Sequence, residues 1–173
     1  ICSESRCSSE QAELLGTLLG QLKAAEIKLD DTDARFAAKL LFKVEDGNWQ
    51  RSTGLLCSAN NPDASDERLR FDFAPSGNRL AGVYSPEAIE FFIACRSKMS
   101  APAERLADWA LAAADEGKRM AVLRYIANGE LGRELAERIR GKGWLADNEV
   151  VSKLKAHLPM RESLIVYCWL ISD

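Results

Sequence analysis

The chain has 173 residues, of which 47% are hydrophobic and 28% are charged. This composition excludes a disordered chain, and the length suits one domain or a small sheet with an attached helical lobe. With 23 basic and 26 acidic residues the net charge is −3, so the chain as a whole does not attract nucleic acid or a membrane. The longest apolar run, residues 164–171, is too short to cross a bilayer as a helix, which takes about 20 residues.

The cysteines and the start of the chain give expectations about the compartment. Three of the five cysteines lie in apolar stretches, as in a reduced protein that uses cysteine as a small buried residue: Cys57, Cys95 and Cys168. The first residue is Ile1 and no secretory signal is visible, so we expect a piece of a longer, cytoplasmic protein. Cys2 and Cys7 are close in sequence, but a structural zinc site needs two more ligands, so we expect no metal site.

The first element is a predicted helix over residues 9–28. Ser8 and Gln11 are spaced as a capping box, in which each side chain bonds to the backbone N–H of the other residue. The apolar side chains recur at helical spacing: Leu14, Leu15, Leu18, Leu19 and Leu22. Such a stripe usually docks a helix on its own domain. The sequence leaves open whether the face over residues 14–22 is buried within this chain or serves a partner.

A small antiparallel sheet is predicted next. The pair Asp46-Gly47 lies between an apolar stretch at residues 40–44 and Trp49, which is followed by the apolar residues 55–57. Glycine tolerates the positive φ of a tight reversal, so this arrangement indicates a β-hairpin. Residues 69–73 then alternate apolar and polar side chains before Pro75. This alternation predicts a third strand with one buried face, ended by the proline.

Helix signals follow one another from residue 85 onward. Ser85-Pro86 supplies a capping hydroxyl and a proline in the first turn, and Asp115 and Asp147 supply later caps. The last apolar run, residues 164–171, is ambiguous: its β-branched residues suit a strand, but its position after a helical array favours a buried helix.

The predicted fold class is therefore α+β. We expect an N-terminal helix and a small antiparallel sheet, followed by a packed array of about five helices. The expected division places the helix and sheet in residues 1–84 and a helical lobe, packed on them as one compact unit, in residues 85–173.

The residue sets that common enzymes need are missing from the sequence. His157 is the single histidine, and near the end of a predicted helix it favours the helix C-terminus more simply than it serves as a base. Glu-x-Lys tripeptides of the kind found in metal-dependent nucleases occur at residues 26–28 and 116–118, but neither lies on a predicted strand. No glycine-rich phosphate loop is present. We expect no catalytic residue, no metal and no cofactor, with a diverged metal-dependent nuclease as the lowest alternative.

The best non-enzymatic signal is a basic stretch. From residue 117 to residue 143 there are seven basic and three acidic side chains, a local charge of +4. The acidic residues alternate with the arginines at helical spacing, which favours ordinary surface ion pairing over a DNA-reading helix. The candidate nucleic-acid contacts of this alternative function are Arg119, Arg124, Arg133, Arg138 and Arg140.

Four short motifs follow one another between residues 40 and 96: Asp46-Gly47-Asn48-Trp49, Arg70-Phe71-Asp72-Phe73-Ala74-Pro75, Tyr84-Ser85 and Glu90-Phe91-Phe92. Their order resembles segments of large sacsin-like proteins. Those proteins carry a heat-shock-protein-like ATPase domain of the GHKL type, whose nucleotide motifs are absent here. The resemblance implies an accessory domain of a large multidomain protein, with ATP handled elsewhere, and it carries over no functional residue. The leading hypothesis is a non-catalytic interaction or scaffold domain that binds protein partners or other domains of its parent.

Overall fold

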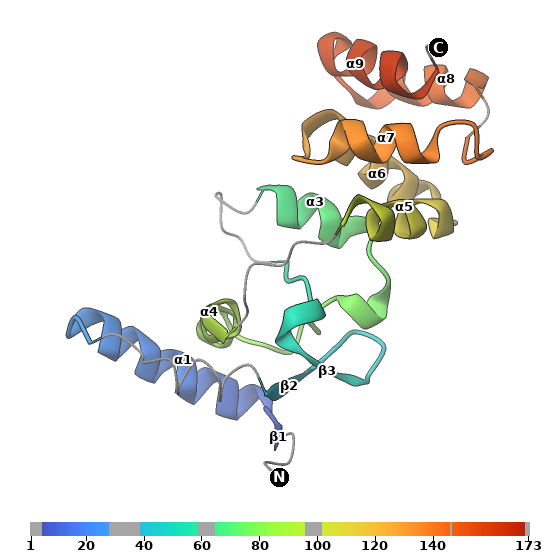
Figure 1. The fold of residues 1–173 in the computed structure, drawn as a ribbon. Helices are drawn as coiled ribbons and strands as arrows, with labels where there is room; N and C mark the ends of the chain where they lie inside the picture. The colour runs from blue at the N-terminus through green and yellow to red at the C-terminus, as the bar shows by residue number, and fades with distance from the viewer. Residues whose placement is uncertain (1–4, 28–38, 59–64, 96–101, 146, 172–173) are drawn as a thin grey trace. The chain divides into compact units, whose positions relative to one another are not determined.

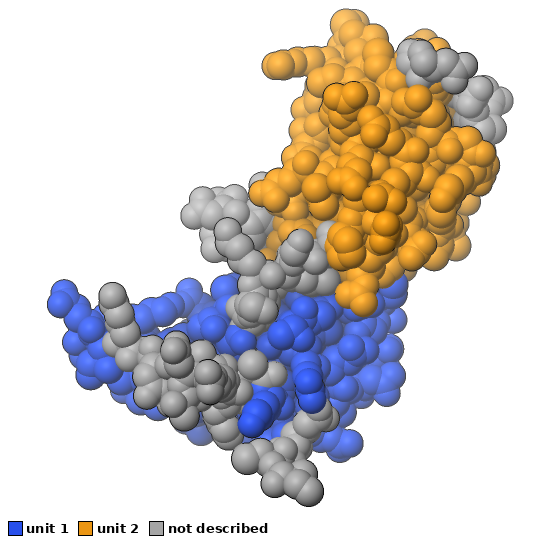
Figure 2. Space-filling model, viewed as in Figure 1, with its two compact units in different colours: residues 1–59, 75–100 blue, residues 60–74, 101–173 orange. Residues whose placement is uncertain are grey.

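The α+β class is confirmed by a computed structural model with a small mixed sheet and many helices (Figure 1). The described residues are 5–27, 39–58, 65–95, 102–145 and 147–171. Two compact units divide the chain: unit 1 holds residues 1–59 and 75–100, and unit 2 holds residues 60–74 and 101–173 (Figure 2). The boundary expected after residue 84 lies inside unit 1. In the described ranges no helix is long and apolar enough to cross a membrane.

The sheet of unit 1 contains β1 (Ser5–Arg6), β2 (Leu40–Lys43) and β3 (Trp49–Arg51), in that order. The hairpin between β2 and β3 is antiparallel as predicted, with Gly47 in its turn at a φ of 88°. β1 pairs with β2 in parallel, so the sheet is mixed rather than purely antiparallel. Short 3-10 turns follow at Ser52–Gly54 and Ser76–Asn78.

The third strand predicted over residues 69–73 is wrong, because these residues belong to helix α3 (Ser65–Phe73) of unit 2. Asp66 and Glu67 lie in its first turn, where the helix dipole favours negative charge. An ion pair between Asp66 and Arg70 at 2.7 Å, one turn apart, adds to this preference. The spacing that suggested a strand also fits a helix. Leu69 and Phe73 are four residues apart, so they lie one turn apart on the same face of α3.

Two helices pack together beside the sheet in unit 1. α1 (Ser9–Ala24) begins with the predicted capping box, and α4 (Pro86–Cys95) begins at the predicted proline. Gly16 lets the two helices approach closely, because a Cβ atom there would overlap the carbonyl oxygen of Glu87. Aromatic contacts join the sheet to α4: the rings of Phe42 and Phe92 meet edge to face with centroids 5.1 Å apart.

Unit 2 consists of helices. After α3 come α5 (Ala103–Ala112), α6 (Glu116–Asn128), α7 (Gly132–Ile139), α8 (Asp147–His157) and α9 (Met160–Leu170). The ambiguous run at residues 164–171 is thus helical through Leu170. α3 packs on α6 through an edge-to-face contact between Phe73 and Tyr125, with centroids 5.6 Å apart. The fully buried aliphatic side chains of this unit include Leu106, Val122, Leu123, Ile126 and Leu135.

Candidate interaction groove and arginine-bearing helices

An apolar groove of unit 2 is formed by α8 and α9, which are joined by Leu158 and Pro159 into a helical hairpin. The Ser163 hydroxyl fixes this hairpin, because its Oγ lies 3.1 Å from the carbonyl oxygens of both Leu154 and Leu158. The hydroxyl can donate its proton to either carbonyl, and the Leu154 carbonyl also accepts a hydrogen bond from the backbone N–H of Leu158 at 3.0 Å. One side chain of α9, Val166, is fully buried and anchors the hairpin in the unit.

A groove with a volume of about 580 Å³ lies between the two helices. Its described lining residues are Val151, Leu154, Lys155, Leu158, Met160, Ser163, Leu164 and Tyr167. Their surface is mostly apolar, and the one charged group among them is the ammonium of Lys155. Three large side chains of the lining are open to solvent: Met160 is 82% exposed, Leu164 60% and Tyr167 39%. Apolar surface gathered in this way is typical of a binding site.

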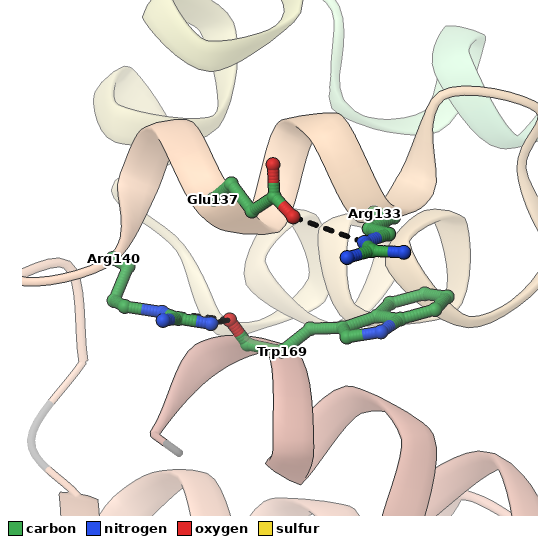
Figure 3. Close-up of polar contacts among 4 residues, drawn as sticks. All are labelled: Arg133, Glu137, Arg140 and Trp169. Atoms are coloured by element: carbon green, nitrogen blue, oxygen red, sulfur yellow. Dashed lines mark hydrogen bonds and ion pairs between the residues drawn. The ribbon is translucent and has the colours of Figure 1, made fainter. Parts of the chain in front are cut away.

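The hairpin is also tied to the rest of unit 2 by polar contacts. The guanidinium of Arg140 donates to the carbonyl oxygen of Trp169 at 2.9 Å, at the end of α9 (Figure 3). The ammonium of Lys153 on α8 lies 2.7 Å from the carboxylate of Glu116 at the start of α6. These contacts hold the groove on a scaffold of packed helices, which reduces the entropy that binding would cost.

The arginines predicted as nucleic-acid contacts lie on or beside α6 and α7, and the structure gives several of them local partners. Arg133 pairs with Glu137 at 3.0 Å, one turn along α7 (Figure 3). Arg138 lies 3.4 Å from Glu104 and 3.2 Å from Glu134. The surface ion pairs expected from the alternating charges are therefore present.

The other two arginines predicted on α6 differ from one another. The Nε of Arg119 donates to the carbonyl oxygen of Ala113 at 3.1 Å, and its side chain is half-buried. Arg124 is exposed on α6. Contact with nucleic acid through the five arginines stays a prediction, and the nearby glutamates would repel a phosphate backbone.

The structure describes some of the residues that the sequence suggested for metal binding or catalysis. Within the described ranges, no group of three or more His, Cys, Asp or Glu side chains could hold a metal ion. Glu116 and Lys118 lie in the first turn of α6, where the Asp115 carboxylate accepts a hydrogen bond from the Lys118 N–H at 2.9 Å. The side chain of His157 and the Cys2 end of the Cys2–Cys7 pair lie outside the described residues.

The cysteines follow the sequence prediction in part. Cys57 and Cys95 are buried, whereas Cys168 is exposed. Burial, with a smaller contribution from Cys7, raises the pKa of the Cys95 thiol to about 12. A thiol with so high a pKa is protonated at neutral pH and is a poor nucleophile or metal ligand.

No family model, no curated protein and no solved structure matches this chain. The residues of the groove were not predicted from the sequence as a site. Leu154 and Leu158 fit the apolar side of a predicted helix, but the sequence does not say which apolar residues stay uncovered. A signal that could have indicated the groove is that α9 has apolar residues on more than one side. Val166 is buried, whereas Leu164 and Tyr167 are exposed.

Proposed function

We propose that this chain is a non-catalytic protein-interaction module, and that the groove between α8 and α9 binds an amphipathic helix of its partner. The observation that carries the proposal is the groove of about 580 Å³ whose lining includes the exposed Met160 and Leu164. A helix laid into an apolar groove is a recurring mode of peptide recognition.

The dimensions of the groove suit a helical ligand. Its lining on α8 runs from Val151 to Leu158, and its lining on α9 runs from Met160 to Tyr167. Seven residues of helix rise about 10 Å, so each wall matches about two turns of a third helix. Two apolar side chains spaced four residues apart, about 6 Å along a helix, would lie within that length.

The charge of the groove specifies the partner further. Lys155 is the charged group among the described lining residues, and no carboxylate accompanies it there. A partner helix with a glutamate or aspartate beside its apolar ridge would pair with this ammonium and gain specificity more than affinity, because the pair would be solvent-accessible.

We propose further that the module belongs to a larger, cytoplasmic protein of the sacsin-like kind, as the sequence resemblance implies. The buried thiols of Cys7 and Cys95 support a reducing compartment, since small proteins of oxidising compartments use cysteines in disulfides. The partner is then a second protein or another domain of the same parent.

Fluorescence anisotropy with a labelled helical peptide tests the binding mode. The peptide carries two leucines four residues apart and a glutamate one turn before the first. We expect it to bind the full chain, and we expect binding to be lost in the Leu164→Glu variant, because a carboxylate would be buried in the groove. The matched control is Leu111→Glu, since Leu111 is an exposed leucine of α5 outside the groove. Equal binding by both variants would contradict the proposal.

A further inference from the structure

A second uncovered apolar surface lies on α1 of unit 1. One side of this helix is buried: Ala12 and Leu19 are in the core, and Gly16 contacts α4. On the other side, Leu14 is 71% exposed and Leu18 is 49% exposed. These two leucines, one turn apart, are called the α1 ridge here. The ridge is the part of the predicted leucine face that the described residues of this chain leave uncovered.

We propose that the α1 ridge of one copy of this chain docks into the α8–α9 groove of a second copy. The inference rests on the proposed function, in which the groove receives a helix with spaced apolar residues and a carboxylate. The occupant of the groove is then α1 of another copy, because α1 has spaced apolar residues and a carboxylate.

The ridge has the spacing that the groove accepts. Leu14 and Leu18 are four residues apart, which is about 6 Å along a helix. Leu22 continues the same row of side chains and is half-buried. Rows of side chains four residues apart are the ridges that pack into grooves when helices meet.

The charges around the ridge and the groove are opposite. Glu10 precedes Leu14 by one turn and is exposed, and its carboxylate accepts a hydrogen bond from the Ser8 hydroxyl at 3.1 Å. Glu13 is exposed beside Leu14. The groove presents the ammonium of Lys155 and no carboxylate among its described lining residues. Docking would therefore bring the acidic start of α1 toward a cation and cover both apolar surfaces together.

Such a contact joins two different surfaces, because the ridge and the groove belong to different parts of each copy. Two copies that make the contact once leave one ridge and one groove open, so that further copies can add as a chain or a ring. Two copies that make it twice, each ridge in the groove of the other copy, form a closed pair.

Sedimentation of the full chain and two variants tests this geometry. Leu14→Glu blocks the ridge and Leu164→Glu blocks the groove, and both positions are exposed, so neither change should prevent folding. We expect the wild-type mass to rise with concentration above the monomer mass of 19.1 kDa. Each variant alone should need about a hundredfold higher concentration to associate, because a carboxylate would enter the apolar contact.

An equimolar mixture of the two variants gives the decisive result. One variant retains its groove and the other retains its ridge, so the mixture should form dimers and nothing larger. The matched controls are Val83→Glu in unit 1 and Leu111→Glu in unit 2, which alter exposed apolar residues outside both surfaces and should associate like wild type.

The outcomes separate this proposal from the proposed function. A wild-type chain that stays monomeric, or association that survives in both blocked variants, overturns docking between copies. If the chain stays monomeric while the leucine peptide still binds and Leu164→Glu still abolishes that binding, the groove binds a helix from another protein. If the peptide also fails to bind, both proposals are overturned.

Discussion

The hydroxyl of Tyr84 donates a hydrogen bond to the carbonyl oxygen of Cys7 at 3.1 Å, across 77 positions of sequence. The phenol oxygen in turn accepts a hydrogen bond from the backbone N–H of Lys43 at 2.7 Å. One phenol thus connects β2 with the residue that follows β1, while its ring packs on Phe42 with centroids 6.0 Å apart. Tyr84 therefore satisfies a backbone group of β2 and one of the residue after β1, and its ring fills part of the core.

Replacing Tyr84 with phenylalanine tests this connection. The ring would be kept, but the Lys43 N–H and the Cys7 carbonyl would each lose a buried partner. We expect the free energy of unfolding of unit 1 to fall by about 1–3 kcal/mol, measured by urea denaturation. Tyr167→Phe is the control, since Tyr167 is 39% exposed. A change of equal size in both variants would contradict the structural role of the Tyr84 hydroxyl.

Replacing Gly16 or Gly20 of α1 with alanine should have opposite effects on stability. Gly16→Ala places a methyl group against the backbone of Glu87 and should destabilise the packing of α1 on α4 by roughly 1–3 kcal/mol. Gly20→Ala has open space around the new methyl group and should stabilise the helix by about 0.5–1 kcal/mol. Thermal unfolding followed by circular dichroism measures both shifts. A stabilising Gly16→Ala would show that the two helices do not approach as described.

Asp66 links α3 to the turn that follows α6. Its carboxylate pairs with Arg70 and accepts a hydrogen bond from the backbone N–H of Glu130 at 2.9 Å. We expect Asp66→Ala to lower the free energy of unfolding of unit 2 by about 2 kcal/mol, because the mostly buried guanidinium of Arg70 loses this carboxylate and the Glu130 N–H loses its acceptor.

The matched control for Asp66 is Asp72→Ala, which removes the more exposed pair of Asp72 with Arg68 at 3.4 Å in the same helix. This change should cost less than about 0.5 kcal/mol. Equal losses in the two variants, measured by chemical denaturation, would argue against a special role of Asp66.

The raised pKa of Cys95 predicts both its reactivity and a dependence of stability on pH. The thiol should resist alkylation by iodoacetamide at pH 8, while the exposed Cys168 reacts, as mass spectrometry of the labelled peptides can show.

In the unfolded chain the thiol of Cys95 has the ordinary cysteine pKa of 9.0, whereas burial in the folded chain raises its pKa to about 12. The unfolded state therefore binds fewer protons between these pH values, so stability falls as pH rises through that window and does not change below it. Rapid labelling of Cys95 in the folded chain would contradict its burial.

The features that the sequence predicted correctly depend on short stretches of chain. The capping box is present with both bonds: the Ser8 N–H donates to Gln11 at 3.0 Å, and the Gln11 N–H donates to Ser8 at 3.2 Å. The turn at Gly47 and the cap at Asp115 are equally local. In each case the groups that make the bond lie within four residues, so residue type and spacing are enough to predict it.

The features that were missed or predicted wrongly depend on distant contacts. β1 pairs with β2 across a long connection, and two residues carry too little pattern to be recognised as a strand. Residues 69–73 are helical where α3 packs on α6, a contact that a five-residue window cannot reveal. The groove exists because Leu154 and Leu164 belong to helices whose shared surface is left uncovered, and uncovered surface is a property of the folded unit alone.

The central claim is that the groove between α8 and α9 binds a protein helix. The most direct test is a nuclear magnetic resonance titration of the full chain, labelled at its methionine methyl groups, with the leucine-glutamate peptide and, separately, with a random DNA duplex. Met160 lines the groove and is 82% exposed, whereas Met120 is 6% exposed in the core and serves as an internal control. We predict that the peptide shifts the Met160 signal and leaves Met120 unchanged, and that the duplex shifts neither. An unmoved Met160 signal with saturating peptide, together with salt-sensitive binding of the duplex, would contradict the account and favour the arginine-bearing helices as the functional surface.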